Sequence, residues 1–120
     1  MPTRLVAIGV LMMAAPVWGH HSHTNFDMTT YTEVDGTVTE VHWFNPHIFI
    51  YLEVTAADGE KTVWALEATS PAGLQGNGIG RDLVKSGDEI SARCHRFKDG
   101  SNGCLLGYLT AADGIERLWD

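Results

Sequence analysis

The chain has 120 residues, 44% of them hydrophobic, which is enough for one modest core and too short for two domains. Its formal net charge at pH 7 is −7, with 15 acidic residues against 8 basic ones. An acidic surface repels phosphate backbones, so the composition argues against nucleic acid as a partner.

The first 19 residues predict a secretory signal peptide. Arg4 precedes an apolar run at residues 5–15, and Val17 and Gly19 stand where small residues precede a cleavage site. The run is shorter than the roughly 20 residues of a membrane-spanning helix. We therefore expect cleavage near Gly19, no membrane span after cleavage, and a periplasmic or secreted protein. Loss of Arg4 leaves seven of the eight basic residues, so the net charge changes from −7 to −8.

Residues 20–33 form a His-rich segment ahead of the single domain that we place at residues 34–120. His20, His21 and His23 fall within four positions of the expected new terminus. Cleavage after Gly19 gives His20 a free α-amine beside its imidazole. This pair can chelate one copper ion if another histidine supplies a third nitrogen, an arrangement called a histidine brace.

Several histidines compete for the role of third ligand, namely His47, His42, His21 and His23. Cleavage one residue later would instead place a histidine at position three of the new terminus, which binds Cu(II) through the amine and two amides. The alternative to a specific site is a solvated His-rich tail that binds metal only incidentally. Both interpretations stay open at this point.

The rest of the chain predicts strands separated by turns. Residues 34–44 are rich in β-branched side chains, Asn45 and Pro46 interrupt them, and residues 47–54 alternate between apolar and polar, so the three stretches predict a hairpin. Residues 61–68 form the third expected strand. Ser70 and Pro71 then have the residue types of a helix N-cap and first helical position, so a short helix should follow.

A second hairpin is expected from residues 89–97 and 104–110, with a last short strand at residues 115–119. This order predicts an all-β fold with minor α content. The expected architecture is a small OB-like β-barrel of five to six strands, with a short helical connection between the third and fourth. An open β-sandwich-like sheet is the alternative.

The first hairpin should have two different faces. A turn centred on Asn45 and Pro46 places Val41 opposite Ile50 on a core face, which also collects Trp43, Ile48, Thr39, Leu52, Thr37 and Val54. The outward face pairs His42 with Phe49, and it also collects Phe44, His47, Glu40, Tyr51, Val38 and Glu53. A bulge would move the residues beyond it to the other face. The rings of Phe44, Phe49 and Tyr51 make the outward face a candidate surface for a partner or ligand. The alternative is that the N-terminal segment or the last strand covers this face and buries these rings.

The remaining cysteine and histidine residues give weaker indications of a functional site. Cys94 and Cys104 flank a turn-rich stretch, and in an exported chain they are expected to form a disulfide. His42 and His47 could form a zinc site with Glu40, Glu53 or Glu67, but they lack the spacing of a known zinc motif. Because Arg96 and Lys98 lie beside His95, we interpret His95 as a surface residue of the second hairpin.

No pattern predicts catalysis. The serines lack the neighbours of a nucleophile motif, and the glycine-rich stretch at residues 76–80 lacks the spacing of a phosphate loop. We therefore expect no catalytic residues and no nucleotide cofactor.

Five stretches together resemble a family of small exported bacterial proteins classed only as a domain of unknown function. They are residues 20–27, 36–47, 64–71, 81–88 and 96–103, which include HHS, G-x-V-x-x-V-x-W-x-N-P-H, W-x-L-E and R-F-K-D-G-S-N-G. The resemblance covers nearly all of the expected mature chain, and it implies an exported all-β protein with no established activity.

The resemblance also implies a set of site residues, which are His20, His21, Ser22, Asn45, Pro46, His47 and Glu67. The sequence departs from the family pattern at His23, where an apolar residue is common. The pair Cys94 and Cys104 is also outside the family motif, which suggests a local staple rather than a shared functional element.

These observations lead to one main hypothesis and two alternatives. The main one is a periplasmic protein that binds a transition metal, copper before zinc, through His20 with His47 or His21, for sequestration or delivery. The first alternative is a binding module whose outward face, with Phe44, Phe49 and Tyr51 and the neighbouring Asn45 and Glu67, docks an envelope protein or ligand. A redox or oxygen-activating copper enzyme is the weaker alternative.

Overall fold

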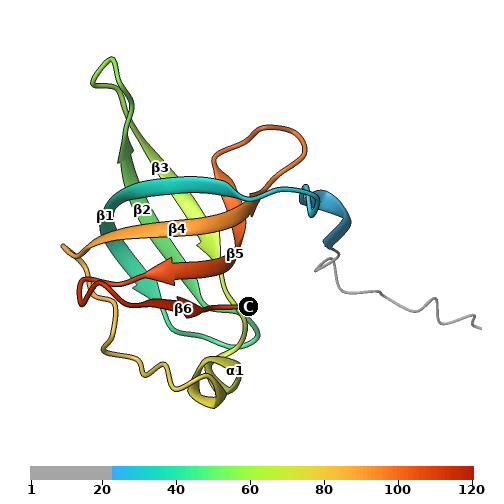
Figure 1. Cartoon of the computed structure of the whole chain (residues 1–120), viewed down its shortest axis with the longest axis vertical. Helices are drawn as coiled ribbons and strands as arrows, with labels where there is room; N and C mark the ends of the chain where they lie inside the picture. The colour runs from blue at the N-terminus through green and yellow to red at the C-terminus, as the bar shows by residue number, and fades with distance from the viewer. Residues whose placement is uncertain (1–22) are drawn as a thin grey trace, which may run out of the picture.

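The computed structural model describes residues 23–120 (Figure 1). The expected signal peptide, its cleavage site, His20 and His21 lie outside the described residues. The elements are the 3₁₀ turn η1 (His23–Asn25), the helix α1 (Pro71–Gly76) and the strands β1 (Thr32–His42), β2 (Phe49–Thr55), β3 (Lys61–Glu67), β4 (Glu89–Arg96), β5 (Gly103–Thr110) and β6 (Glu116–Leu118). No helix within residues 23–120 is long and apolar enough to cross a membrane.

The strands form a small closed barrel, as the order of strand patterns predicted. The sheet runs β3-β2-β1-β4-β5-β6, and a parallel pairing of β3 with β5 closes a barrel of five strands to which β6 adds an edge (Figure 1). Closure satisfies the backbone groups of strands that would otherwise be edges. The expected all-β fold with little helix is therefore confirmed.

The core follows from the period of two along each strand. Alternate residues point inward, so β2 buries Ile50 and Leu52 and β3 buries Trp64 and Leu66. The short helix α1 adds Leu74 to the same core at one end of the barrel (Figure 1). Ser70 caps α1 as expected, since its hydroxyl accepts a hydrogen bond from the backbone N–H of Gly73 at 3.1 Å.

The predicted register of the first hairpin is correct near its turn and wrong farther away. His42 pairs with Phe49, Val41 with Ile50 and Glu40 with Tyr51, as expected. Between Val38 and Glu40 a β-bulge adds one residue to β1, and this moves the residues beyond it to the opposite face.

Three positions at or beyond the bulge therefore need correction. Thr37, expected on the core face, pairs with Glu53 and so shares the outward face. Val38, expected on the outward face, pairs with Leu52 and is buried. Thr39, expected in the core, is exposed at the bulge. The connection that follows β1 contains the cis peptide bond Asn45–Pro46.

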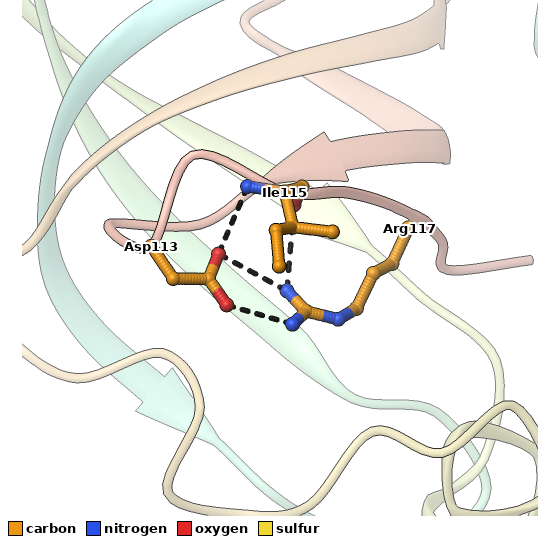
Figure 2. Close-up of polar contacts among 3 residues, drawn as sticks. All are labelled: Asp113, Ile115 and Arg117. Atoms are coloured by element: carbon orange, nitrogen blue, oxygen red, sulfur yellow. Dashed lines mark hydrogen bonds and ion pairs between the residues drawn. The ribbon is translucent and has the colours of Figure 1, made fainter.

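An ion pair fixes the turn between β5 and β6. Arg117 donates to both carboxylate oxygens of Asp113, at 3.2 and 2.7 Å, and the backbone N–H of Ile115 donates to the same carboxylate at 3.0 Å (Figure 2). The hydrogen bonds from Arg117 and Ile115 hold the pKa of Asp113 below its ordinary value. This turn directs β6 back along β5, so that the buried Trp119 joins the core.

The expected disulfide is present. Cys94 of β4 and Cys104 of β5 are bonded and buried, ten positions apart in the sequence. The bond lies beside the hairpin loop at residues 97–102, and it therefore restrains the base of that loop.

We predict that the double substitution Cys94→Ala and Cys104→Ala lowers the free energy of unfolding by about 2–4 kcal/mol, because the unfolded chain gains conformational entropy without the cross-link. Urea denaturation of the non-reduced proteins measures this change. Lys98→Ala, in the same loop and exposed, should leave the midpoint near that of the wild type. Equal midpoints for the wild type and the double variant would contradict the prediction.

Candidate functional site

Two of the predicted histidines line one pocket. His23, at the start of the described chain, and His47, just before β2, both border a hollow of about 370 Å³. Asn25, Glu67, Thr69 and Asp120 complete its polar lining, and its apolar walls are Phe26, Phe49, Ala68, Phe97 and Leu105. Segments distant in the sequence therefore converge at this site, and they bring imidazoles and carboxylates together.

The outer face of the barrel supplies the floor of this pocket. Phe49 of β2 pairs with Glu67 of β3, and Glu67 pairs in turn with Leu105 of β5. Paired residues project on the same side of a sheet, so these three side chains share the outward face. The floor therefore belongs to rigid strands rather than to a loop.

His47 and Glu67 form the closest polar contact in the pocket floor. Nδ1 of His47 lies 2.9 Å from Oε1 of Glu67, and the two side chains are 26% and 15% exposed. Two backbone hydrogen bonds fix the chains next to the pair: the N–H of Ile48 donates to the carbonyl of Thr69 and the N–H of Ala68 donates to the carbonyl of Ile48. The separation of His47 and Glu67 is thus set by backbone pairing.

An aromatic stack anchors the N-terminal segment over this floor. The rings of Phe26 and Phe97 are stacked with centroids 4.5 Å apart, and the two residues also form an isolated antiparallel bridge. On either side of the bridge, the N–H of Asp27 donates to the carbonyl of Arg96 at 2.8 Å and the N–H of Lys98 donates to the carbonyl of Asn25 at 2.9 Å. A segment near a chain terminus stays ordered only when it is tied down, and these contacts tie it to the β4–β5 hairpin (Figure 1).

Glycine makes room for this anchor. A side chain at Gly103 would place its Cβ 2.5 Å from the ring of Phe97. Farther along β5, a Cβ at Gly107 would lie 2.6 Å from the ring of Tyr31. Both aromatic rings therefore rest directly on the backbone of β5.

A second anchor involves His95, which sequence reasoning interpreted as a surface residue of the hairpin. In the structure His95 is half-buried, its ring stacks on Tyr31 with centroids 4.4 Å apart, and Nδ1 lies 3.1 and 2.9 Å from the carbonyl oxygens of Asp27 and Thr30. Because a carbonyl can only accept, Nδ1 carries the proton. The earlier interpretation is corrected: His95 fastens the N-terminal segment to β4.

Hydrogen bonds from Thr29 shape the turn within this anchored segment. Its hydroxyl and its backbone N–H both donate to the carboxylate of Asp27. These two bonds lower the pKa of Asp27 below its ordinary value, so the carboxylate stays ionised and the turn keeps its bonds at neutral pH.

Other residues proposed from the sequence lie outside the pocket lining. His42 contacts Glu40 instead, with Nε2 of His42 2.8 Å from Oε2 of Glu40. Phe44 is 64% exposed, and Asn45 is also exposed. Of the outward aromatic residues, Phe49 lines the pocket, whereas Tyr51 stacks on Phe49 and makes an edge-to-face contact with His42.

The described residues alone do not assemble a metal centre. Within residues 23–120, no group of three or more histidine, cysteine, aspartate or glutamate side chains is close enough to hold an ion. A second hollow of about 420 Å³ is lined by Asp35, Glu53 and Glu89 among others and by none of the histidines. This acidic hollow is therefore separate from the histidine pocket, and it is slightly larger.

Sequence reasoning missed several pocket residues. Phe26 and Phe97 belong to the motifs FD and R-F-K-D-G, yet nothing in the sequence shows that they meet. Asp120 reaches the pocket only because β6 returns along β5. His47 is nominated from the faces of the hairpin and Glu67 from the family resemblance, and both lie on a regular strand or directly beside one.

We predict that Phe26→Ala speeds hydrogen exchange at the amides of Asp27 and Lys98 by on the order of tenfold or more, because loss of the stack weakens the bridge that protects them. Amide exchange followed by NMR measures the effect at each position. Met28→Ala, an exposed residue in the same segment, should leave both amides protected. Unchanged exchange in the Phe26 variant would show that the stack does not hold the segment.

Comparison with known proteins gives one match. Searches among curated proteins and among solved structures found no significant match. The model of DUF6152, described as a family of unknown function, matches residues 7–106, which is more than half of the chain and includes most of the pocket residues. The chain therefore belongs to DUF6152.

Proposed function

We propose that the processed protein binds one transition-metal ion at the histidine pocket, copper in preference to zinc, and sequesters or delivers it in the cell envelope. The observation that carries the proposal is that His23 and His47 line the same pocket. The anchoring of the chain just after His23 supports it, because a terminal ligand is useful only if the terminus is held near the other ligands.

The length of the chain supports a contribution from His20. An extended chain spans at most about 3.3–3.6 Å per residue, so three residues span at most about 11 Å. His23 itself borders the pocket. A ligand at position 20 would therefore be joined to the pocket by a short length of chain.

The donor chemistry favours Cu(II) among the candidate ions. The α-amine and ring of His20 would provide two nitrogens and His47 a third, with His21 and His23 as the alternatives, and nitrogen ligands suit copper, nickel and zinc. Thiolate ligands favour Cu(I), but Cys94 and Cys104 are joined in a disulfide and so cannot act as thiolates. The acidic side chains of Glu67 and Asp120 border the pocket and favour a cation there.

We predict that mature protein beginning at His20 binds one Cu(II), and that acetylation of its N-terminal amine lowers the affinity on the order of 100-fold, because the acetylated nitrogen can no longer act as a ligand beside the ring of His20. Competition titration and electron paramagnetic resonance measure affinity and coordination. His47→Ala should lose affinity similarly. His42→Ala, a histidine outside the pocket, is the matched control and should bind normally. Equal binding by both N-terminal forms would contradict the proposal.

A second candidate function rests on the outward aromatic side chains. Phe49, Tyr51, His42 and Phe44 form a continuous series of ring contacts, with centroid separations of 6.4, 4.8 and 5.8 Å, and Phe44 at its end is exposed. Exposed rings of this kind favour a protein or ligand interface. We propose, as the alternative, that this series docks an envelope protein or ligand.

We predict for this alternative that Phe44→Ala weakens binding of the envelope partner on the order of 30-fold, as expected for truncation of an interface anchor, and leaves the Cu(II) affinity unchanged. Quantitative capture by immobilised mature protein measures the partner. Val63→Ala removes another exposed apolar side chain from the neighbouring strand β3 and should retain capture. Equal capture by the Phe44 variant and the wild type would exclude Phe44 from the interface.

A further inference from the structure

The His47 ring presents its two nitrogens to different surroundings. Nδ1 is buried and lies 2.9 Å from Oε1 of Glu67. The side chain as a whole is nevertheless 26% exposed, so its exposed area belongs to atoms other than Nδ1. Nε2 is the second nitrogen of the ring, and His47 lines the pocket.

The contact with Glu67 assigns the proton of the neutral ring. An ionised carboxylate can only accept a hydrogen bond, so a short contact with it requires the proton to be on Nδ1. With the proton on Nδ1, the ring lone pair of a neutral imidazole is on Nε2, and a metal ion binds imidazole through such a lone pair.

His42, the last residue of β1, shows the opposite arrangement. In the pair of His42 and Glu40, the carboxylate lies 2.8 Å from Nε2 instead of Nδ1. Its side chains are 40% and 64% exposed, so water competes with the contact. The two pairs contain the same groups, but only the pair of His47 and Glu67 is largely enclosed and borders the pocket.

We infer that Glu67 is a positioning residue, which holds His47 in the Nδ1–H tautomer and thereby presents Nε2 to a metal ion in the pocket. The inference deepens the proposed function and rests on it. Carboxylates in this role orient a metal-binding imidazole and raise its basicity, and their loss typically lowers metal affinity 10–100-fold.

The strands around Glu67 suit it to this role. Glu67 lies between Phe49 and Leu105 in the sheet, with a backbone partner on each side. A carboxylate on a doubly paired strand moves less than one on a loop. Glu67 can therefore fix the ring of His47 before any ion arrives.

The tautomer can be measured without any metal. Long-range ¹H–¹⁵N correlation spectra of the metal-free mature protein, at about pH 8, where an imidazole is neutral, distinguish Nδ1–H from Nε2–H. We expect the wild type to hold His47 as Nδ1–H. Glu67→Met, similar in length but unable to accept strongly, should shift His47 toward Nε2–H, and Glu67→Gln should give a mixture.

The control is Glu40→Met, which removes the carboxylate of the exposed pair outside the pocket. It should leave the tautomer of His47 and the Cu(II) affinity unchanged, whereas Glu67→Met should lower the affinity about 10–100-fold. The comparison separates an effect on His47 from a general change in surface charge.

The possible failures are distinguishable. The inference is overturned if His47 is in the Nε2–H tautomer in the wild type, or if it stays in the Nδ1–H tautomer in Glu67→Met. Either result decides the matter independently of the Cu(II) affinity. The wild-type spectrum tests it even if the Met variant does not fold. A tautomer that depends on Glu67, together with no Cu(II) uptake by the wild type, would uphold the assignment of Glu67 and contradict the proposed function alone.

Discussion

The arrangement of the pocket depends on the stack of Phe26 on Phe97. This contact joins Phe26 to a hairpin residue 71 positions later in the chain, Phe97. Without this stack, the turn η1 that carries His23 would have few contacts with the barrel, because η1 contains only three residues and buries none of them. The stack therefore turns a short His-rich segment into one wall of a defined pocket.

The disulfide and a glycine of β5 support the stack of Phe26 on Phe97. The disulfide between Cys94 and Cys104 restrains the base of the loop that carries Phe97, and Gly103 leaves space for the ring. Tyr31 and His95 form a second stack of the same kind farther along the segment, and the ring of Tyr31 lies against Gly107. The strands β4 and β5 thus hold the N-terminal segment through two aromatic contacts, each resting on a glycine.

The sequence predicted the strands well because their alternation is regular and their turns are rich in glycine, aspartate and proline. It predicted the pairing of His42 with Phe49 for the same reason, and it failed beyond Val38 because a bulge leaves no clear trace in the pattern. His47 and Glu67 could be nominated, but their contact depends on the pairing of β2 with β3. Phe26 and Asp120 could not be placed, since long-range packing rather than periodicity brings them to the pocket.

The parallel closure of β3 against β5 has a further consequence for the coupling between binding and stability. It joins Glu67 to Leu105, so the pocket floor forms only when distant parts of the chain have come together. A partly folded chain would therefore present no complete pocket, and any ligand held there would bind the native state alone. At a free concentration 100 times its dissociation constant, such a ligand would add about 2.7 kcal/mol to the stability of the entire barrel.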